Sequence, residues 1–227
     1  MKIVILTGAG MSADSGISTF RDSGGLWENH DIMEVASPEG WKANPELVLD
    51  FYNKRRRQVL EAQPNPGHEA LADLEKYFDV QIITQNVDDL HERAGSKNVL
   101  HLHGELLKMR SSGDENLIYE CRKDILPGDL CKKGHQLRPH IVWFGEMVPM
   151  IEPAAQQAQE ADIFAVIGTS LQVYPAAGLI NYTAPSIPKF LIDPKTPESA
   201  ISNFEIIQET AAIGTPKLVQ KIIENYG

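Results

Sequence analysis

The sequence predicts an α/β fold, with a Rossmann-like parallel sheet and helices on both of its faces. Two observations carry this prediction: short runs rich in β-branched residues alternate with helical stretches, and several of these runs are apolar throughout. Continuous apolar runs are typical of strands buried on both faces, whose carboxyl ends open onto a ligand crevice. We expect strands at residues 3–6, 80–84, 99–101, 163–167, 189–192 and 205–207.

Two stretches interrupt this alternation and predict a small module made of two insertions. Residues 25–66 contain a helical segment at 45–63 without a clear strand, and residues 106–139 are polar and hold both cysteines. We therefore expect a single domain over residues 1–227, with a large Rossmann-like part at about 1–24, 67–105 and 140–227. The small module then comprises about 25–66 and 106–139.

Composition argues against several classes of function. A net charge of −10 with a single tight run of basic residues leaves no phosphate-backbone footprint, so direct nucleic-acid binding is not expected. No apolar run approaches the ~20 residues that a membrane-spanning helix needs, and the opening run is too short for a secretory signal. The two cysteines are too few for a disulfide framework. We predict a cytoplasmic protein that does not engage membranes.

The first expected strand runs into a glycine-rich turn, Gly8-Ala9-Gly10-Met11-Ser12-Ala13. It fits G-x-G-x-x-G/A, which lets backbone amides approach a pyrophosphate at a helix start, although a turn serving only close packing has the same pattern. The chain continues as a loop of small residues that includes Phe20 and Arg21. The ribose-binding acid that a dehydrogenase carries about 20 residues on is missing, which argues against hydride transfer.

Polar side chains follow two further strands. Gln85, Asn86 and Asp88 can hydrogen-bond ribose hydroxyls and an amide such as nicotinamide, although a polar strand-end turn uses the same residue types. His101 and His103 alternate along the next strand and share a face. Histidine titrates near neutral pH, so one of them is a candidate general base, whereas a single histidine can also be structural.

Five ordered motifs resemble those of the sirtuin family. They are Gly8-Ala9-Gly10-x-Ser12-x-x-Ser15-Gly16-Ile17-x-x-Phe20-Arg21, Thr84-Gln85-Asn86-Val87-Asp88-x-Leu90-His91, His103-Gly104, Val142-x-Phe144-Gly145-Glu146 and Gly168-Thr169-Ser170-Leu171-x-Val173-x-Pro175-Ala176. The resemblance spans residues 8–176, and motifs of this complexity in this order are highly specific.

The resemblance implies an NAD-consuming protein lysine deacylase. The acyl oxygen of a modified lysine would displace nicotinamide and form an alkylamidate, and His103 would then activate a ribose hydroxyl, so that free lysine and O-acyl-ADP-ribose are released. His101 is expected to be structural, and Phe20 to guard the nicotinamide pocket. Acylated-lysine proteins or peptides would add as a strand along an edge made by Val142, Phe144, Gly145 and Glu146. The implied NAD-binding residues are Gly8, Ala9, Gly10, Ser12, Ser15, Gly16, Ile17, Phe20, Arg21, Gln85, Asn86, Val87, Asp88, Gly168, Thr169, Ser170, Asp193 and Ala212.

The expected helix at 45–63 places Tyr52 and Arg55 on one face, three residues apart. A phenol and a guanidinium together suit a carboxylate, so a dicarboxylic acyl group would be favoured over acetyl. The pair also resembles the Tyr-x-x-Arg of the desuccinylating and demalonylating branch, which implies removal of succinyl and malonyl as well as acetyl groups. The alternative is a solvated face on which three consecutive arginines balance Asp50 or Glu61.

Two departures from the family pattern concern a metal and the adenosine half of NAD. The family usually holds a structural zinc with two C-x-x-C pairs, but this chain reads Met109-Arg110-Ser111-Ser112 at the first pair. Only Cys121 and Cys131 remain, with His135 as a third donor, so we expect a module held by packing; zinc bound with help from Asp or Glu is the alternative. Asp193 replaces an asparagine that in the family helps to hold adenosine.

Three other functions share parts of this pattern. Transfer of ADP-ribose onto a protein would use the same NAD pocket without needing Tyr52 and Arg55. A non-catalytic NAD-sensing module would not require His103. A nicotinamide-dependent dehydrogenase is disfavoured by the missing ribose-binding acid.

Overall fold

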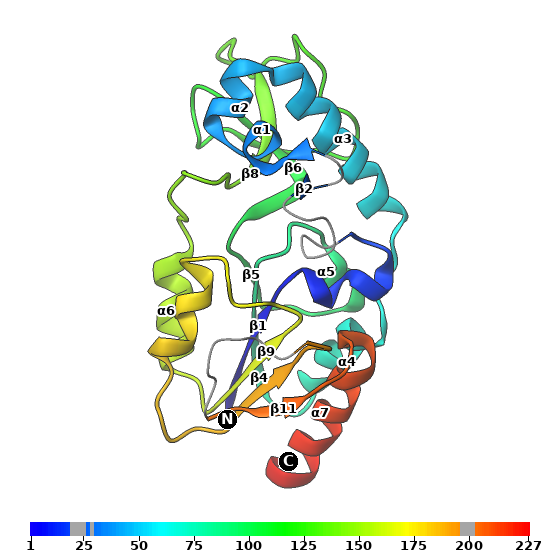
Figure 1. Cartoon of the computed structure of the whole chain (residues 1–227), viewed down its shortest axis with the longest axis vertical. Helices are drawn as coiled ribbons and strands as arrows, with labels where there is room; N and C mark the ends of the chain where they lie inside the picture. The colour runs from blue at the N-terminus through cyan, green and yellow to red at the C-terminus, as the bar shows by residue number, and fades with distance from the viewer. Residues whose placement is uncertain (19–25, 28–29, 196–202) are drawn as a thin grey trace.

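The computed structural model describes residues 1–18, 26–27, 30–195 and 203–227, and the chain forms two parts, one above the other in Figure 1. The lower part holds a six-stranded parallel sheet in the order β11-β10-β9-β1-β4-β5. Its strands are β1 (Lys2–Thr7), β4 (Asp79–Thr84), β5 (Val99–His101), β9 (Ile163–Ile167), β10 (Lys189–Ile192) and β11 (Glu205–Ile207). Each expected strand lies within one residue of its predicted ends, and the α/β class is confirmed.

Apolar residues alternate along β1 and bury both faces of the sheet. Ile3 and Ile5 pack in one core with α4 (Pro66–Leu74) and α7 (Ala211–Tyr226). Val4 and Leu6 pack in a second core with α6 (Ile151–Gln159) and the 3₁₀ segment η4 (Ala176–Tyr182). In Figure 1, α4 and α7 lie side by side on one side of the sheet, and α6 lies on the other. All four β1 side chains are fully buried, and each such burial stabilises the fold by about 1.5–3 kcal/mol.

The strand order reverses next to β1. From β1 the chain moves outward through β4 and β5, and it later returns to the other side of β1 to form β9, β10 and β11. The turns that follow β1 and β9 are therefore neighbours at the carboxyl edge of the sheet. Open parallel sheets bind ligands at such a reversal of strand order, so this edge is where a cleft is expected.

The upper part is a small module built around a three-stranded antiparallel sheet in the order β7-β6-β8. Its elements are β2 (Leu26–Trp27), β3 (His30–Asp31), α1 (Ile32–Val35), α2 (Pro38–Ala43), α3 (Pro45–Glu61), β6 (Gly104–Ser111), β7 (Ile118–Glu120) and β8 (Leu137–Ile141). α3 begins where the Asn44 side chain accepts a hydrogen bond from the Leu47 N–H, with Pro45 in the first turn. The proposed boundaries between the two parts stay a prediction.

Two buried side chains of α3, Asn53 and Arg56, tie the loops of the small module together; we call them the α3 anchor. The Asn53 amide donates to the Ile125 carbonyl and accepts from the Ile125 N–H, both at 2.9 Å. Arg56 donates from Nε to the Leu106 carbonyl at 3.0 Å and from Nη1 to Asn53 Oδ1 at 2.6 Å. The helix is thereby fixed both to β6 and to the segment before β8.

Among the described residues, no helix combines the length and the apolar character needed to cross a bilayer.

Candidate active site

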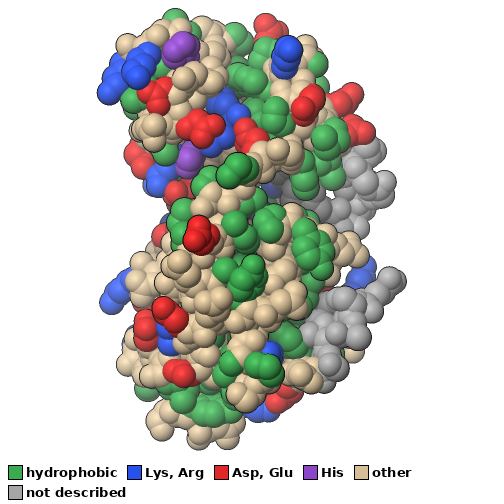
Figure 2. Space-filling view, turned by 90° about the vertical axis from the view of Figure 1, so that its left-hand side faces the viewer, with side chains coloured by type: hydrophobic (Ala, Val, Ile, Leu, Met, Phe, Trp, Pro, Cys, Tyr) green, Lys and Arg blue, Asp and Glu red, His purple; other side chains and the backbone are tan. Residues whose placement is uncertain are grey.

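A cavity of about 330 Å³ lies between the carboxyl edge of the parallel sheet and the small module. Figure 2 shows a waist between the two parts on one face of the molecule, with hydrophobic side chains gathered beside it. The cavity brings together eighteen of the residues predicted from the sequence: Gly8, Ala9, Ser12, Ile17, Tyr52, Arg55, Gln85, Asn86, Val87, Asp88, His103, Val142, Phe144, Gly145, Glu146, Gly168, Thr169 and Ser170.

Some predicted NAD-binding residues do not line this cavity. Asp193 is fully buried at the end of β10, where its Oδ1 accepts from the Lys195 N–H at 2.9 Å, and Ala212 lies in the first turn of α7. Gly10, Ser15 and Gly16 belong to the turn after β1 but are also absent from the lining. Phe20 and Arg21 lie outside the described residues.

The glycine turns after β1 and β9 pack directly against each other. The Gly10 N–H donates to the Gly168 carbonyl at 2.8 Å, and Gly168 has a φ of 64°. A Cβ on Gly168 would lie 2.4 Å from the Met11 nitrogen, so a side chain there would force the turns apart. After β1 the chain forms short 3₁₀ turns, Ala9–Met11 and Ala13–Ser15, in place of the long helix of a dehydrogenase. The glycines leave backbone close to the cavity, which suits a pyrophosphate.

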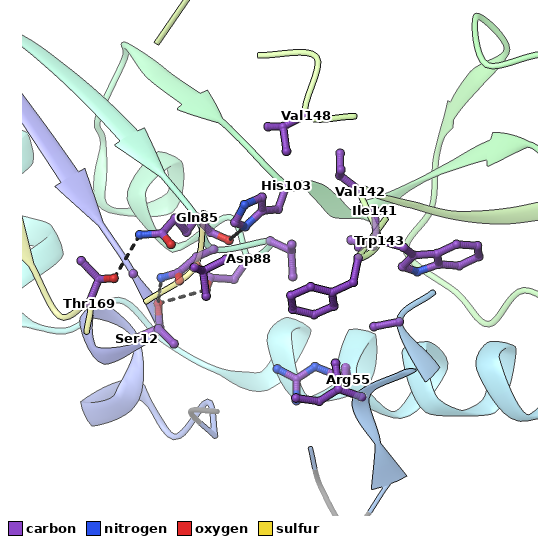
Figure 3. A pocket seen from close by; sticks show the side chains of 18 of the residues that line it. Ser12, Arg55, Gln85, Asp88, His103, Ile141, Val142, Trp143, Val148 and Thr169 are labelled. Atoms are coloured by element: carbon purple, nitrogen blue, oxygen red, sulfur yellow. Dashed lines mark hydrogen bonds between the residues drawn. The ribbon is translucent and has the colours of Figure 1, made fainter. Parts of the chain in front are cut away.

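Ser12 links Asn86 and Asp88 by hydrogen bonds at the sheet edge. Ser12 Oγ donates to Asp88 Oδ2 at 2.9 Å and accepts from Asn86 Nδ2 at 3.1 Å, as the dashed lines of Figure 3 mark. Asp88 also accepts from the Leu90 N–H at 3.1 Å. Burial raises the pKa of Asp88, and the bonds from Leu90 and Ser12 oppose that shift. The polar residues that follow β4 are thus fixed by one another before any ligand binds.

A buried histidine stands behind this group. His68 Nδ1 accepts from the Asn65 N–H at 3.2 Å, so in the neutral ring Nε2 carries the hydrogen and faces Ser12 Oγ at 3.5 Å. Burial lowers the pKa of His68 to about 4, which keeps the ring neutral near pH 7. His68 was not predicted as a site residue, because nothing in its spacing along the sequence links it to Ser12.

Gln85 connects the turns after β4 and β9. Its Nε2 donates to Thr169 Oγ1 at 3.2 Å, and Thr169 Oγ1 also accepts from the Leu171 N–H at 3.3 Å. Figure 3 shows Gln85 between Thr169 and His103 on the sheet side of the cavity. Side chains from the ends of β4 and β9, on either side of β1, therefore meet at this edge of the sheet.

His103 is oriented by a backbone carbonyl. Its Nδ1 lies 3.0 Å from the Gln85 carbonyl oxygen, which can only accept, so Nδ1 carries the hydrogen and Nε2 is the basic nitrogen of the neutral ring. Burial lowers the pKa of His103 below 6.5, and the bond to Gln85 opposes that shift. Gly104 follows with a φ of 82°, and a Cβ there would lie 2.1 Å from the His140 carbonyl oxygen. The glycine lets the chain turn directly after the histidine.

His101 makes a different set of bonds on the same side of the strand. Its Nδ1 lies 3.2 Å from the Asn86 carbonyl and its Nε2 lies 2.7 Å from Glu92 Oε1. The pKa of His101 is raised: burial lowers it, but the hydrogen bond and charge of Glu92 outweigh burial. The ring does not line the cavity, and its contacts hold the loop that carries Asn86.

The three consecutive arginines of α3 have three different environments. Arg55 is 5% exposed and lines the cavity with the fully buried Tyr52, whereas Arg56 belongs to the α3 anchor. Only Arg57 is exposed, and it pairs with Asp124. Asp50 pairs with Lys54. The alternative of a solvated arginine face therefore applies to Arg57 alone. In Figure 3, Arg55 lies across the cavity from His103 and Val142.

The segment from Val142 to Glu146 differs from the extended edge that we expected. The Glu146 N–H donates to the Trp143 carbonyl at 3.0 Å and Gly145 has a φ of 89°, so the chain turns here. The N–H groups of Val142 and Phe144 donate to the carbonyls of His103 and Ala36. The Glu146 carboxylate binds Arg110 and Arg138. Motif similarity marks this segment, but the turn depends on contacts with distant parts of the chain.

Ten further residues line the cavity, and none of them was predicted as a site residue from the sequence. They are Ser18, Ile32, Ala36, Val59, Ile141, Trp143, Val148, Val173, Tyr174 and Pro175. Val173 and Pro175 belong to the motif at residues 168–176, and Trp143 lies between the predicted residues Val142 and Phe144. Trp143 is 2% exposed, and its indole Nε1 donates to the Tyr52 hydroxyl oxygen at 3.1 Å.

The described residues of the small module do not fit a structural zinc. Cys121 and Cys131 are free thiols buried in an apolar cluster with Leu49, Ile125 and Leu137. Cys131 Sγ donates to Ser111 Oγ at 3.2 Å, at the position where the first cysteine pair was expected. In the part of the chain that the structure describes, no group of three or more His, Cys, Asp or Glu side chains is placed to hold a metal.

The fold and this cavity define a protein of the Rossmann-like α/β class, with one cavity between the carboxyl edge of its parallel sheet and the small module. The chain belongs to the Sir2 family, whose pattern matches residues 8–175. It is 57% identical to an NAD-dependent protein deacylase of Helicobacter pylori over 224 residues, covering 98% of both chains.

Solved structures agree with this family membership. A Sir2 homologue in complex with NAD has a TM-score of 0.89 and 40% identity, with 98% of this chain and 90% of that chain covered. A Sir2 protein bound to an acetylated peptide has a TM-score of 0.79 and 29% identity, covering 98% and 92%.

Proposed function

We propose that this chain is an NAD-dependent protein lysine deacylase that removes succinyl and malonyl groups, and also acetyl groups, from lysine side chains. One observation carries the proposal: His103, with Nε2 as its basic nitrogen, lines the same cavity as the strand-end turns and as Tyr52 and Arg55. Family membership and relatives named NAD-dependent protein deacylase support the NAD-dependent activity. A Sir2 complex with NAD and another with an acetylated peptide support the cofactor and the substrate class.

The turns after β1 and β9 would hold the pyrophosphate of NAD, and the polar groups after β4 would hold its ribose and nicotinamide. Gly8 and Ala9 leave backbone exposed to the cavity, and Asn86 and Asp88 offer amide and carboxylate groups that are already fixed through Ser12. Groups fixed in advance lose little conformational freedom when they bind a ligand. NAD would supply the ADP-ribosyl group that accepts the acyl group, and one water molecule would supply the oxygen that allows free lysine to leave, with nicotinamide and O-acyl-ADP-ribose as the other products.

His103 would take the proton from the ribose hydroxyl that attacks the acyl group. Its Nδ1–H is held by the Gln85 carbonyl, which fixes the ring and leaves Nε2 to accept the proton. Burial lowers the pKa of His103, so the ring is neutral and able to act as a base near pH 7.

Tyr52 and Arg55 would bind the distal carboxylate of a succinyl or malonyl group. Arg55 brings a positive charge, and Tyr52 brings a hydroxyl group on the same side of α3. Burial raises the pKa of Tyr52 well above its usual range, so the phenol is neutral and can donate its hydrogen. A charge-assisted bond in a buried site is stronger than one in water, which favours an acidic acyl group over acetyl.

The test compares matched succinyl-lysine and acetyl-lysine peptides, each incubated with the purified protein and NAD, with nicotinamide release followed by mass spectrometry. We expect faster turnover of the succinyl peptide. Arg55→Met should lower kcat/KM for that peptide by about 10- to 100-fold, the range for a hydrogen bond to a charged group, and should spare the acetyl peptide.

Arg57→Met is the matched control, because it makes the same change two residues further along α3 at an exposed pair with Asp124. It should leave both rates unchanged. Equal turnover of both peptides by the unsubstituted protein would contradict the acidic-acyl preference and leave the deacylase activity standing. Absence of peptide-dependent nicotinamide release would contradict the deacylase activity itself.

A further inference from the structure

A buried indole stands next to the acyl-binding tyrosine, in a segment otherwise proposed to bind the peptide. Trp143 Nε1 donates to the Tyr52 hydroxyl oxygen at 3.1 Å, and both side chains are buried. A carboxylate can only accept hydrogen bonds, so a tyrosine that binds one must donate its hydrogen. The direction of the Tyr52 O–H is therefore a determinant of acyl specificity.

The indole N–H fixes that direction. Two hydrogens cannot point at each other across a 3.1 Å contact, so the Tyr52 hydrogen must turn away from the indole nitrogen. The bond from Trp143 also polarises the hydroxyl group and makes it a better donor, because hydrogen bonds in a chain strengthen one another. A phenylalanine at position 143 would fill most of the same space without either effect.

The indole is itself held in place by a charged group. The Arg138 guanidinium lies 3.3 Å from the centre of the Trp143 ring. Glu146 binds Arg138 at 2.8 Å and accepts from the Trp143 backbone N–H at 2.8 Å. Trp41 packs against the same indole, with ring centres 5.7 Å apart. The ring therefore has little freedom to move the N–H away from Tyr52.

We propose that Trp143 is a specificity-determining positioning residue, which orients the Tyr52 hydroxyl as a hydrogen-bond donor toward an acidic acyl group. This inference rests on the proposed acidic-acyl preference and adds a residue to it. Trp143 acts through Tyr52 and does not need to touch the substrate. The opposite relation, in which Tyr52 only satisfies a buried indole N–H, predicts no effect on acyl selectivity.

The test is a double-substitution cycle with Trp143→Phe, Tyr52→Phe and the pair, measured on succinyl- and acetyl-lysine peptides with saturating NAD. Trp143→Phe should lower kcat/KM for the succinyl peptide about three- to tenfold, the range of one neutral hydrogen bond, mainly through KM. The acetyl peptide should change less than twofold. In the Tyr52→Phe background, Trp143→Phe should have no further effect on the ratio of the two rates.

Trp41→Phe is the matched control, since it removes an indole N–H from the neighbouring ring of the same aromatic cluster. It should leave the succinyl-to-acetyl ratio unchanged, and thermal unfolding of each variant identifies any loss of folding. Equal losses on both peptides, or additive effects in the double variant, would overturn the role of Trp143 while leaving the acidic-acyl preference intact. Equal turnover of both peptides by the unsubstituted protein would overturn both.

Discussion

At the sheet end of the cavity, polar side chains from separate strand ends hold one another, whereas at the module end the two acyl-binding candidates come from a single helix. Ser12 hydrogen-bonds to Asn86 and Asp88, and these residues follow β1 and β4, which pair as parallel strands. Tyr52 and Arg55 instead depend on where α3 lies, and α3 is placed by the Asn53 and Arg56 anchor.

This difference indicates how the two tasks are divided. The sheet end carries groups that every NAD-dependent turnover would need, and its geometry is fixed by backbone pairing together with hydrogen bonds between side chains of separate strand ends. The module end carries groups that would distinguish one acyl group from another, and its geometry is fixed by side chains. A change at the first end should affect all acyl substrates equally, and a change at the second should affect them selectively.

The largest effect is expected from a substitution at the sheet end of the cavity, which would serve every acyl substrate. His103→Asn keeps a donor for the Gln85 carbonyl but removes the basic ring nitrogen. We expect kcat to fall by roughly 10²- to 10⁴-fold, the range of general base catalysis, on acetyl and succinyl peptides alike. NAD binding, measured by calorimetry, should be retained. A loss confined to one peptide would contradict the division between the two ends.

A smaller effect is expected when the α3 anchor is cut. Asn53→Ala removes both bonds to Ile125 and leaves the buried Arg56 without one acceptor. The free energy of unfolding should fall by about 1–3 kcal/mol, the cost of unsatisfied buried polar groups, as measured by urea denaturation.

The same variant also tests the acyl-binding end of the cavity, and a chelator added to the unsubstituted protein tests for a metal. The succinyl KM should rise while NAD affinity stays unchanged, and EDTA should leave the unfolding of the unsubstituted protein unaltered. Lys54→Ala, at an exposed pair with Asp50 on the same helix, is the control and should be close to neutral. Strong destabilisation by the chelator would show that a bound metal holds the module.

The smallest effect is expected in the pH dependence of kcat/KM, which tests whether the sheet end serves both peptides. A general base acts when it is deprotonated, and burial lowers the pKa of His103 below 6.5. On acidification, activity should therefore persist to a lower pH than an unperturbed histidine base would allow. The acid limb of kcat/KM should coincide for both peptides, because His103 serves both. A limb above pH 6.5, or one that differs between the peptides, would contradict this assignment.

The sequence was most informative where local pattern decides structure. Parallel strands are marked by short runs rich in β-branched residues, which are continuously apolar where the strand is buried, and all six were predicted to within one residue. Residues at strand ends were predicted to meet because parallel strands share a carboxyl edge, and Gln85 and Thr169 do meet there. The pairing of Tyr52 with Arg55 followed from helical spacing in the same way.

What the sequence could not predict depends on contacts between distant segments. Positions 55, 56 and 57 are all arginine, so residue type does not distinguish them. Only the packing of α3 against β6 decides that Arg55 lines the cavity and that Arg56 belongs to the α3 anchor. The bond from Trp143 to Tyr52 joins residues 91 positions apart. Asp193 and Ala212 do not line the cavity, and their assignment to the adenosine half of NAD stays a prediction.

The contact between the turns after β1 and β9 has a consequence for synthesis on the ribosome. Thr7 pairs with Ile167, so the central strand lacks one of its neighbours until most of the polypeptide has been translated. A nascent chain that ends before Gly168 has the first glycine turn but not the surface that closes over it. The edge that we propose to hold the pyrophosphate can therefore form only after translation has passed Gly168, and a product truncated before that residue should not bind NAD.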